Sequence, residues 1–343
     1  MPLNKKLTVG PSPHVRSGAT TTGIMLDVII ALVPALIASV YYFGPGALAL
    51  AGVCVGTCMA AEYLSRKAMK RPNTLGDLSA IVTGLLLAFN LPVSFPLWMA
   101  AIGAVVAIVV VKQFFGGLGK NFVNPALLAR IVLFLSFGKQ MTSWTAPFAW
   151  KNGPDAVTTA TPLNLFKLNG LYLVDNMKNI ESTPGMPSML KMFFGERGGS
   201  LGEVCAVALI LGGAYLLFRR VITPVIPLTY VGTFAAVMLL AGKGDLAFVG
   251  YQVLGGGLLL GAIFMATDYA TSPINIKGQL IFAAGCGLLT AAIRLFGSMP
   301  EGVSFSIILM NLLVPHIERW TLPKAFGTPK EKRKENEKSG VKT

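Results

Sequence analysis

The residues best suited to chemistry lie together in the stretch Asp155-Ala-Val-Thr-Thr-Ala-Thr161-Pro. Pro162 biases Thr161 toward an extended backbone that displays its side chain. A threonine hydroxyl can accept a covalent group, but it is a weak nucleophile and needs a partner enzyme to activate it. Asp155 could hold a metal or position such an enzyme. The alternative interpretation of this stretch is an ordinary polar loop.

Two further polar turns interrupt apolar sequence. The first, Gly116–Ala126, contains Asn121 and Asn124, and the second, Met265–Pro273, contains Asp268. Amide side chains both donate and accept hydrogen bonds, and glycines allow close backbone approach. Such turns suit a ligand with a mixed polar edge. Helix capping around a re-entrant turn is the alternative, and both roles can hold at once.

The elements that must position these residues are membrane helices. The chain has 343 residues, of which 53% are hydrophobic and 13% charged, and its mean hydropathy is +0.64. A soluble domain carries about 25% charged residues. The net charge of +14 comes from basic residues that lie between apolar runs and in the tail. This pattern is typical of helix-flanking loops, so we expect an integral membrane protein that does not bind nucleic acid.

Ten apolar segments run through the chain. The third and the fifth are short, as expected of half-helices that dip toward a site where irregular backbone lines a cavity. We therefore predict an all-α polytopic membrane protein with about ten transmembrane helices, some of them short or broken. The segments are 22–43, 46–64, 76–90, 95–115, 124–137, 201–218, 224–241, 246–264, 277–296 and 303–320.

The uneven distribution of lysine and arginine among the loops predicts the orientation. With the N-terminus inside, the short outer loops carry only Lys243. Both termini are then cytoplasmic, and the one long loop is exported. The predicted organisation is a cytoplasmic N-terminal segment (1–21), a first membrane repeat (22–137), the exported loop with the threonine motif (138–200), a second membrane repeat (201–320) and a basic cytoplasmic tail (321–343).

The two membrane repeats share a weak sequence pattern. Each holds five helices, and an odd number inverts the second copy relative to the first. The turns around 121–124 and 268–273 would then both face the cytoplasm, where they could build one site. The matching positions are Gly84, Phe89, Asn90 and Pro92 in the first half and Gly261, Phe264, Asp268 and Pro273 in the second.

The threonine segment closely resembles the flavin-attachment sequence of membrane redox pumps. The family comprises the D subunit of the Rnf ferredoxin:NAD oxidoreductase complex and its relative, the B subunit of the sodium-pumping NADH:quinone reductase. In these proteins a flavin transferase on the outer side esterifies the FMN phosphate to the last threonine of the motif. The resemblance makes Thr161 the acceptor. Asp155, Thr158 and Ala160 match the motif, and Thr159 stands where glycine is more common.

The resemblance covers residues 12 to about 320, nearly the whole chain. Ser12-Pro-His14 and the two polar turns match as well. The first helix starts near residue 22, without the longer N-terminal extension of the quinone-reductase subunit, which favours the Rnf-type subunit. The resemblance also implies a second, non-covalent flavin, riboflavin, near the cytoplasmic side. Its expected ligands are Asn121, Asn124, Asp268, Gly117 and Gly119.

The implied function is electron transfer through two flavins, coupled to Na⁺ or H⁺ transport, in a complex with the A, B, C, E and G subunits of the Rnf system. A flavin transferase would mature the chain, and its place would be the bacterial cytoplasmic (inner) membrane. The sequence shows no phosphate-cradling loop, so NADH and ferredoxin chemistry belongs to other subunits. A solute transporter or channel with inverted repeats, and an anchor that only assembles the complex, are the competing interpretations.

Several other residues invite weaker hypotheses. Asp27 could line an ion path, or pair with Arg130 or with another subunit, because an ionisable group inside the membrane is functional by default. Arg294 is a second basic residue within an apolar segment. The four cysteines predict packing residues rather than a metal site. Ser17-Gly-Ala-Thr20 also resembles the attachment core, but its predicted cytoplasmic position makes it the N-terminal cap of the first helix.

Overall fold

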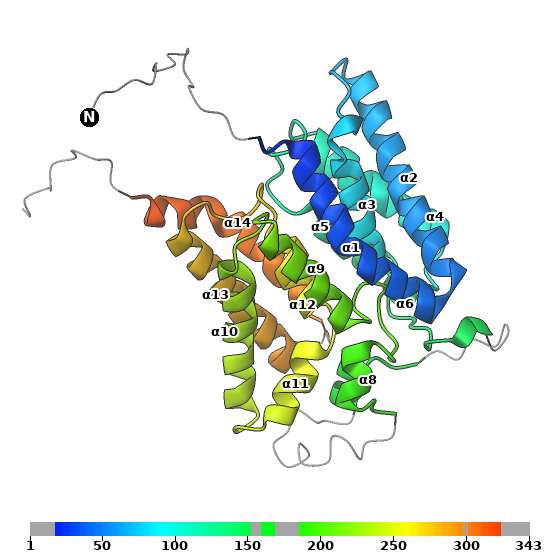
Figure 1. The fold of residues 1–343 in the computed structure, drawn as a ribbon, viewed down its shortest axis with the longest axis vertical. Coiled ribbons are helices and arrows are strands. Elements are labelled where there is room, and N and C mark those ends of the chain that lie inside the picture. Colours follow the sequence, from blue (N-terminus) through cyan, green and yellow to red (C-terminus); the bar gives the residue numbers. More distant parts are fainter. Residues whose placement is uncertain (1–17, 152–158, 169–184, 298, 300, 324–343) are drawn as a thin grey trace, which may run out of the picture.

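The computed structural model describes residues 18–151, 159–168, 185–297, 299 and 301–323. Within these residues every regular element is a helix (Figure 1). All ten predicted apolar segments are helical. They form α1 (Thr21–Phe43), α2 (Pro45–Ala68), α3 (Ser79–Phe89), α4 with η2 (Leu97–Val105 and Val106–Gln113), α5 (Pro125–Ser136), α9 (Ala206–Phe218), α10 (Val225–Ala241), α11 with α12 and η5 (Leu246–Leu254, Leu258–Leu260 and Gly261–Met265), α13 (Ile276–Phe296) and α14 (Val303–Thr321).

The helices differ in length, as expected of a membrane protein in which some spans are short or broken. Among the described residues, α1, α2 and α13 are each long and apolar enough to cross a membrane. The eighth segment is not one straight helix, because α11 and the helical stretch 258–265 meet at an angle of 66°. Five more apolar helices have 10–17 residues, including α3 and α5. The described residues thus confirm the predicted fold class, an all-α polytopic membrane protein in which some helices are short or broken.

The two five-helix halves pack in corresponding ways. In the first half, α2 and α5 each pack against both α3 and α4. In the second half, α10 packs against α11 and α13, and α14 packs against α13 and η5. The halves meet through equivalent helices, α1 with α9 and α5 with α14. Figure 1 shows α1 and α9 side by side at the centre of the molecule. This pairing supports an internal repeat, and the inversion across a membrane stays a prediction.

Close contact between α1 and α9 depends on a glycine. A Cβ added at Gly212 of α9 would overlap the carbonyl oxygen of Ala31 in α1. Small residues at such an interface let two helix backbones approach closely and gain dispersion contacts.

The N-terminus of α1 is capped as predicted. The side chain of Thr20 accepts a hydrogen bond from the backbone N–H of Gly23.

Short helices connect the two halves. They are α6 (Gly138–Met141), η3 (Ala149–Lys151), α7 (Pro162–Leu168) and α8 (Met189–Phe194). The turn that follows α8 then docks on the end of α3, where the N–H groups of Leu201 and Gly202 donate to the carbonyls of Leu91 and Phe89. In Figure 1 the beginning of α1 and the end of α14 lie in the upper part, and α8 lies in the lower part. Helix α8 therefore lies on the side opposite to those helix ends.

Candidate functional site

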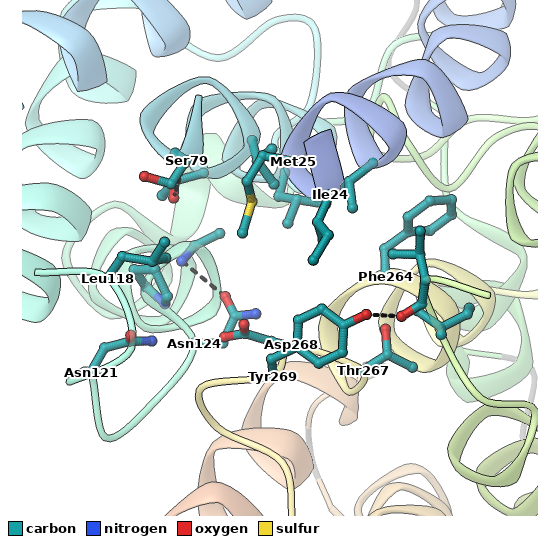
Figure 2. A pocket seen from close by; sticks show the side chains of 18 of the residues that line it. Ile24, Met25, Ser79, Leu118, Asn121, Asn124, Phe264, Thr267, Asp268 and Tyr269 are labelled. Atoms are coloured by element: carbon teal, nitrogen blue, oxygen red, sulfur yellow. Dashed lines mark hydrogen bonds between the residues drawn. The ribbon is translucent and has the colours of Figure 1, made fainter. Parts of the chain in front are cut away.

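A cavity lies between the two halves, next to the beginning of α5. We call it the amide cavity, since Asn121 and Asn124 line it (Figure 2). The empty space in it, including the part open to solvent, is about 780 Å³. In Figure 2, Ile24 and Met25 face Asn124 and Asp268 across the cavity. The first half contributes residues such as Ile24, Met25, Ser79, Lys112, Leu118, Asn121 and Asn124, and the second half contributes Leu216, Ile222, Phe264, Thr267, Asp268 and Tyr269.

Asn124 joins the two halves at this cavity. Its Oδ1 caps α5 by accepting from the N–H groups of Ala126 (3.1 Å) and Leu127 (3.3 Å), and its Nδ2 donates to the carbonyl of Met265 (3.3 Å). The backbone N–H of Asn124 donates to the amide oxygen of Asn311, in the side-chain orientation that satisfies both groups. An amide nitrogen carries two hydrogens, so Asn124 retains one donor for a ligand.

Asp268 and Asn121 lie beside each other in the wall. Asp268 accepts from the backbone N–H of Ala270 (3.3 Å) and the hydroxyl of Thr271 (3.2 Å). Burial raises the pKa of the Asp268 carboxyl, and the hydrogen bonds from Ala270, Thr271 and Asn121 oppose that rise. The structure thus brings together the three polar residues that the sequence placed at one site.

The two glycines predicted beside them do not line this cavity. Gly117 and Gly119 have φ of +105° and +82°, a conformation that favours glycine. A Cβ at Gly117 would overlap the guanidinium of Arg66, and nothing lies within 4 Å of one at Gly119. Their visible role is to shape the 116–124 turn that presents Asn121 and Asn124.

A buried ion pair at the same cavity was missed from the sequence. Lys112 is 2% exposed, and its Nζ lies 2.8 Å from Glu62 Oε2 and 2.5 Å from the hydroxyl of Ser79. Gln113 and Thr74 hold the other oxygen of Glu62, at 3.1 and 2.7 Å. The signal was present, because a lysine and a glutamate inside apolar segments require partners. Lys112 belongs to η2, a π-helical stretch, and η5 across the cavity is another; such stretches often mark functional sites.

A second cavity lies farther along α5, and its empty space, including the part open to solvent, is about 510 Å³. We call it the arginine cavity, because Arg130 lines it together with aromatic side chains. Arg130 donates to Asn90 Oδ1 (3.1 Å) and to the hydroxyl of Ser304 (2.8 Å), and it forms ion pairs with Glu301 and, at 3.5 Å, with Glu203. Its lining residues include Phe134, Trp144, Asn164, Met299, Glu301, Ser304 and Phe305.

Thr161 lies near the arginine cavity, three residues before its lining residue Asn164. Thr161 is 8% exposed, and its hydroxyl accepts from the backbone N–H of Asn164 (3.2 Å), which caps α7. Thr159 is partly buried and Ala160 is exposed. Asp155 and Thr158 lie outside the described residues, so their place relative to Thr161 stays a prediction.

One proposed pairing was wrong. Asp27 does not pair with Arg130; it lies 3.3 Å from Arg219 and accepts from the hydroxyl of Tyr215 at 2.9 Å. Arg294 is fully buried and donates to the carbonyls of Gln252 (2.5 Å) and Gly255 (3.2 Å). In the described part of the chain no group of His, Cys, Asp and Glu residues has the arrangement of a metal site.

Known proteins resemble this chain along nearly its full length. The family model described as the NQR2, RnfD, RnfE family matches residues 8–327. The D subunit of the Na(+)-translocating ferredoxin:NAD(+) oxidoreductase complex of Acetobacterium woodii is 47% identical over 95% of this chain and 97% of its own. The D subunit of the proton-translocating ferredoxin:NAD(+) oxidoreductase complex of Clostridium ljungdahlii is 42% identical, over 94% of this chain and 96% of its own. The D subunit of the ion-translocating oxidoreductase complex of Stutzerimonas stutzeri is 39% identical, over 89% and 91%.

Proposed function

Because the chain belongs to the NQR2, RnfD, RnfE family, we propose that it is the D subunit of an ion-translocating ferredoxin:NAD oxidoreductase complex of the Rnf type. The observation that carries this proposal is the 47% identity to such a subunit over 95% of the chain. The protein is an integral membrane component of a redox enzyme complex and works with the other Rnf subunits. The exchanged ion is Na⁺ or H⁺, since relatives named for each ion are 47% and 42% identical to this chain.

We propose further that Thr161 carries FMN through a phosphoester. The support is the motif that ends at Thr161 and the position of this residue next to the arginine cavity. The hydroxyl is largely buried and caps α7, so a transferase can reach it only before α7 docks or when α7 detaches. The transferase supplies the activation that a neutral hydroxyl lacks.

The amide cavity is the proposed site of a second, non-covalent flavin. Its residues fit a flavin in two respects: Asn124 keeps one unused amide hydrogen, and the remaining wall is mainly apolar. Asn121 and Asn124 would bind the polar edge of the ring, and apolar residues such as Met25 and Phe264 would exclude water from it.

Bound flavins would supply one-electron redox chemistry, which no side chain of this protein provides. The chain itself would position the two groups on opposite sides of the barrier. The buried charges of Lys112 and Arg130, each balanced by carboxylates, set the electrostatic environment of the two cavities. The location that follows is the bacterial cytoplasmic membrane, with both termini inside and the 138–200 connection outside.

The assignment of Thr161 is tested in the intact complex, co-expressed with a flavin transferase. We expect the wild-type subunit and Thr161→Ser to fluoresce under ultraviolet light on a denaturing gel, because serine keeps the hydroxyl. Thr161→Val should show no band. Thr321→Val, which removes a hydroxyl at the end of α14, should keep it. A fluorescent Thr161→Val band contradicts the proposal.

The second flavin is tested by extracting non-covalent flavin from the purified complex. Asn124→Ala should lose it, together with about 1 kcal/mol of stability from the lost helix cap. Thr20→Ala removes the cap of α1 and serves as the matched control, because Thr20 does not line the amide cavity. Equal riboflavin content in the two variants rules out the site.

A further inference from the structure

Arg197 is a buried arginine with an unpartnered nitrogen on its guanidinium. It lies in the turn after α8 and is 5% exposed. Its Nη2 donates to the backbone carbonyl of Glu203, and its Nη1 has no hydrogen-bond partner. In the part of the chain that the structure describes, no carboxylate forms an ion pair with it. Burial lowers the pKa of Arg197 to about 10, so it remains positively charged at neutral pH.

The surroundings of Arg197 are rich in charged side chains. Three buried guanidiniums, those of Arg130, Arg197 and Arg294, gather near two carboxylates, Glu203 and Glu301. Both carboxylates are engaged by Arg130. A guanidinium N–H that is buried without an acceptor is costly, so Nη1 of Arg197 favours an anionic acceptor beside it.

Other unused donors lie in the same place. The hydroxyls of Thr159 and Ser200 and the indole N–H of Trp144 are buried without hydrogen-bond partners. They are neighbours in the fold. The N–H of Thr159 donates to the carbonyl of Trp144 (3.0 Å), and a Cβ at Gly198, next to Arg197, would overlap Thr159 Oγ1. All of these groups can donate hydrogen bonds, and an anion accepts them.

The predicted attachment residue is close to these donors. Thr161 follows Thr159 by two residues, so their Cα atoms are separated by at most about 7 Å. A phosphoester that joins a riboflavin unit to a threonine is a diester with one negative charge. Guanidinium groups bind such phosphates through paired N–H donors.

From this geometry we infer that Arg197, assisted by the hydroxyls of Thr159 and Ser200, holds the phosphodiester of the flavin carried by Thr161. The inference rests on the proposed function, because it requires FMN on Thr161. It goes beyond that function by assigning the counter-ion of the phosphate to a residue in a different segment of the chain. Arg197 is a positioning residue that fixes the tether, and it takes no part in the redox step.

The first experiment is ³¹P NMR of the flavin-loaded complex in detergent. Gel fluorescence establishes beforehand that each variant carries flavin. In Arg197→Gln the phosphodiester resonance should move from its wild-type position toward that of a solvent-exposed flavin diester, and Arg197→Lys should lie between them. Arg319→Gln, at an exposed arginine on α14, should leave the resonance in place. An unchanged resonance in a fully loaded Arg197→Gln complex overturns the inference.

A second measurement keeps the test decisive if Arg197→Gln folds poorly. The thermal midpoint of the complex is compared with and without flavin transferase in the host. Flavin attachment should raise the midpoint of the wild type and of Arg197→Lys, because the phosphodiester supplies an acceptor for the buried cation at position 197. It should raise that of Arg197→Gln much less. An equal rise in all three refutes the inference, whereas a wild-type subunit that never carries flavin refutes the proposed function instead.

Discussion

The Nζ of Lys112 lies 2.8 Å from Oε2 of Glu62, and both side chains are withdrawn from solvent at the edge of the amide cavity. The pair joins η2 to α2, two elements of the first half. Ser79, at the start of α3, accepts a further hydrogen bond from the same ammonium group. Three helical elements therefore depend on one buried charge pair.

Removing one partner of this pair should destabilise the protein strongly. We expect Lys112→Met to lower the free energy of unfolding by about 3–5 kcal/mol, because it leaves the Glu62 carboxylate buried and unpaired. Glu62→Gln combined with Lys112→Met should recover much of that loss. The measurement is thermal unfolding of the purified complex. Lys191→Met breaks an exposed pair with Glu196 and should cost less than about 1 kcal/mol. Equal effects of the two single variants would argue against burial as the cause.

Gly212 should be far less replaceable than Gly232. A Cβ at Gly212 would overlap the backbone of α1, whereas one at Gly232 in α10 meets nothing within 4 Å. Gly212→Ala should destabilise by about 1–3 kcal/mol through forced separation of α1 and α9. Gly232→Ala should be neutral or stabilise by up to about 1 kcal/mol, because alanine favours helix. Thermal midpoints of the two variants test this difference, and a tolerant Gly212 would show that the halves do not pack this closely.

Hydrophobic segments and caps could be predicted from the sequence, whereas charge partners could not. The ten helices follow from apolar length, and the cap at Thr20 follows from residue type. Partner choice depends on packing between distant segments. Arg130 contacts Glu301, 171 positions away, and Asp27 contacts Arg219, 192 positions away.

The break in the eighth segment was only partly predictable. The sequence predicts one apolar segment over 246–264, but the chain bends between α11 and α12. Gly255, Gly256 and Gly257 fill this bend, and Gly256 has φ of +65°. Added Cβ atoms at Gly256 and Gly257 would approach Leu163 and Glu203, respectively. Those neighbours come from other segments, so the need for glycine is a tertiary constraint.

Because of Asp268, the free energy of unfolding should fall as the pH rises. Burial raises the pKa of this carboxyl above its ordinary value of 3.8. The contribution of Asp268 to the free energy of unfolding is therefore fully present below pH 3.8, and it is lost as the pH rises through the pKa of the folded state. Asp268→Asn mimics the protonated form. Thermal midpoints from mildly acidic to neutral pH should thus decline more for the wild type than for Asp268→Asn. Parallel declines would show that another group controls this range.

The two cavities share one wall helix, since Ala126 lines the amide cavity and Arg130 lines the arginine cavity. Four residues along α5 correspond to a rise of about 6 Å, whereas the hydrocarbon core of a membrane is about 30 Å thick. The two cavities therefore meet α5 at positions about one helical turn apart, so a displacement of this helix would alter the walls of both.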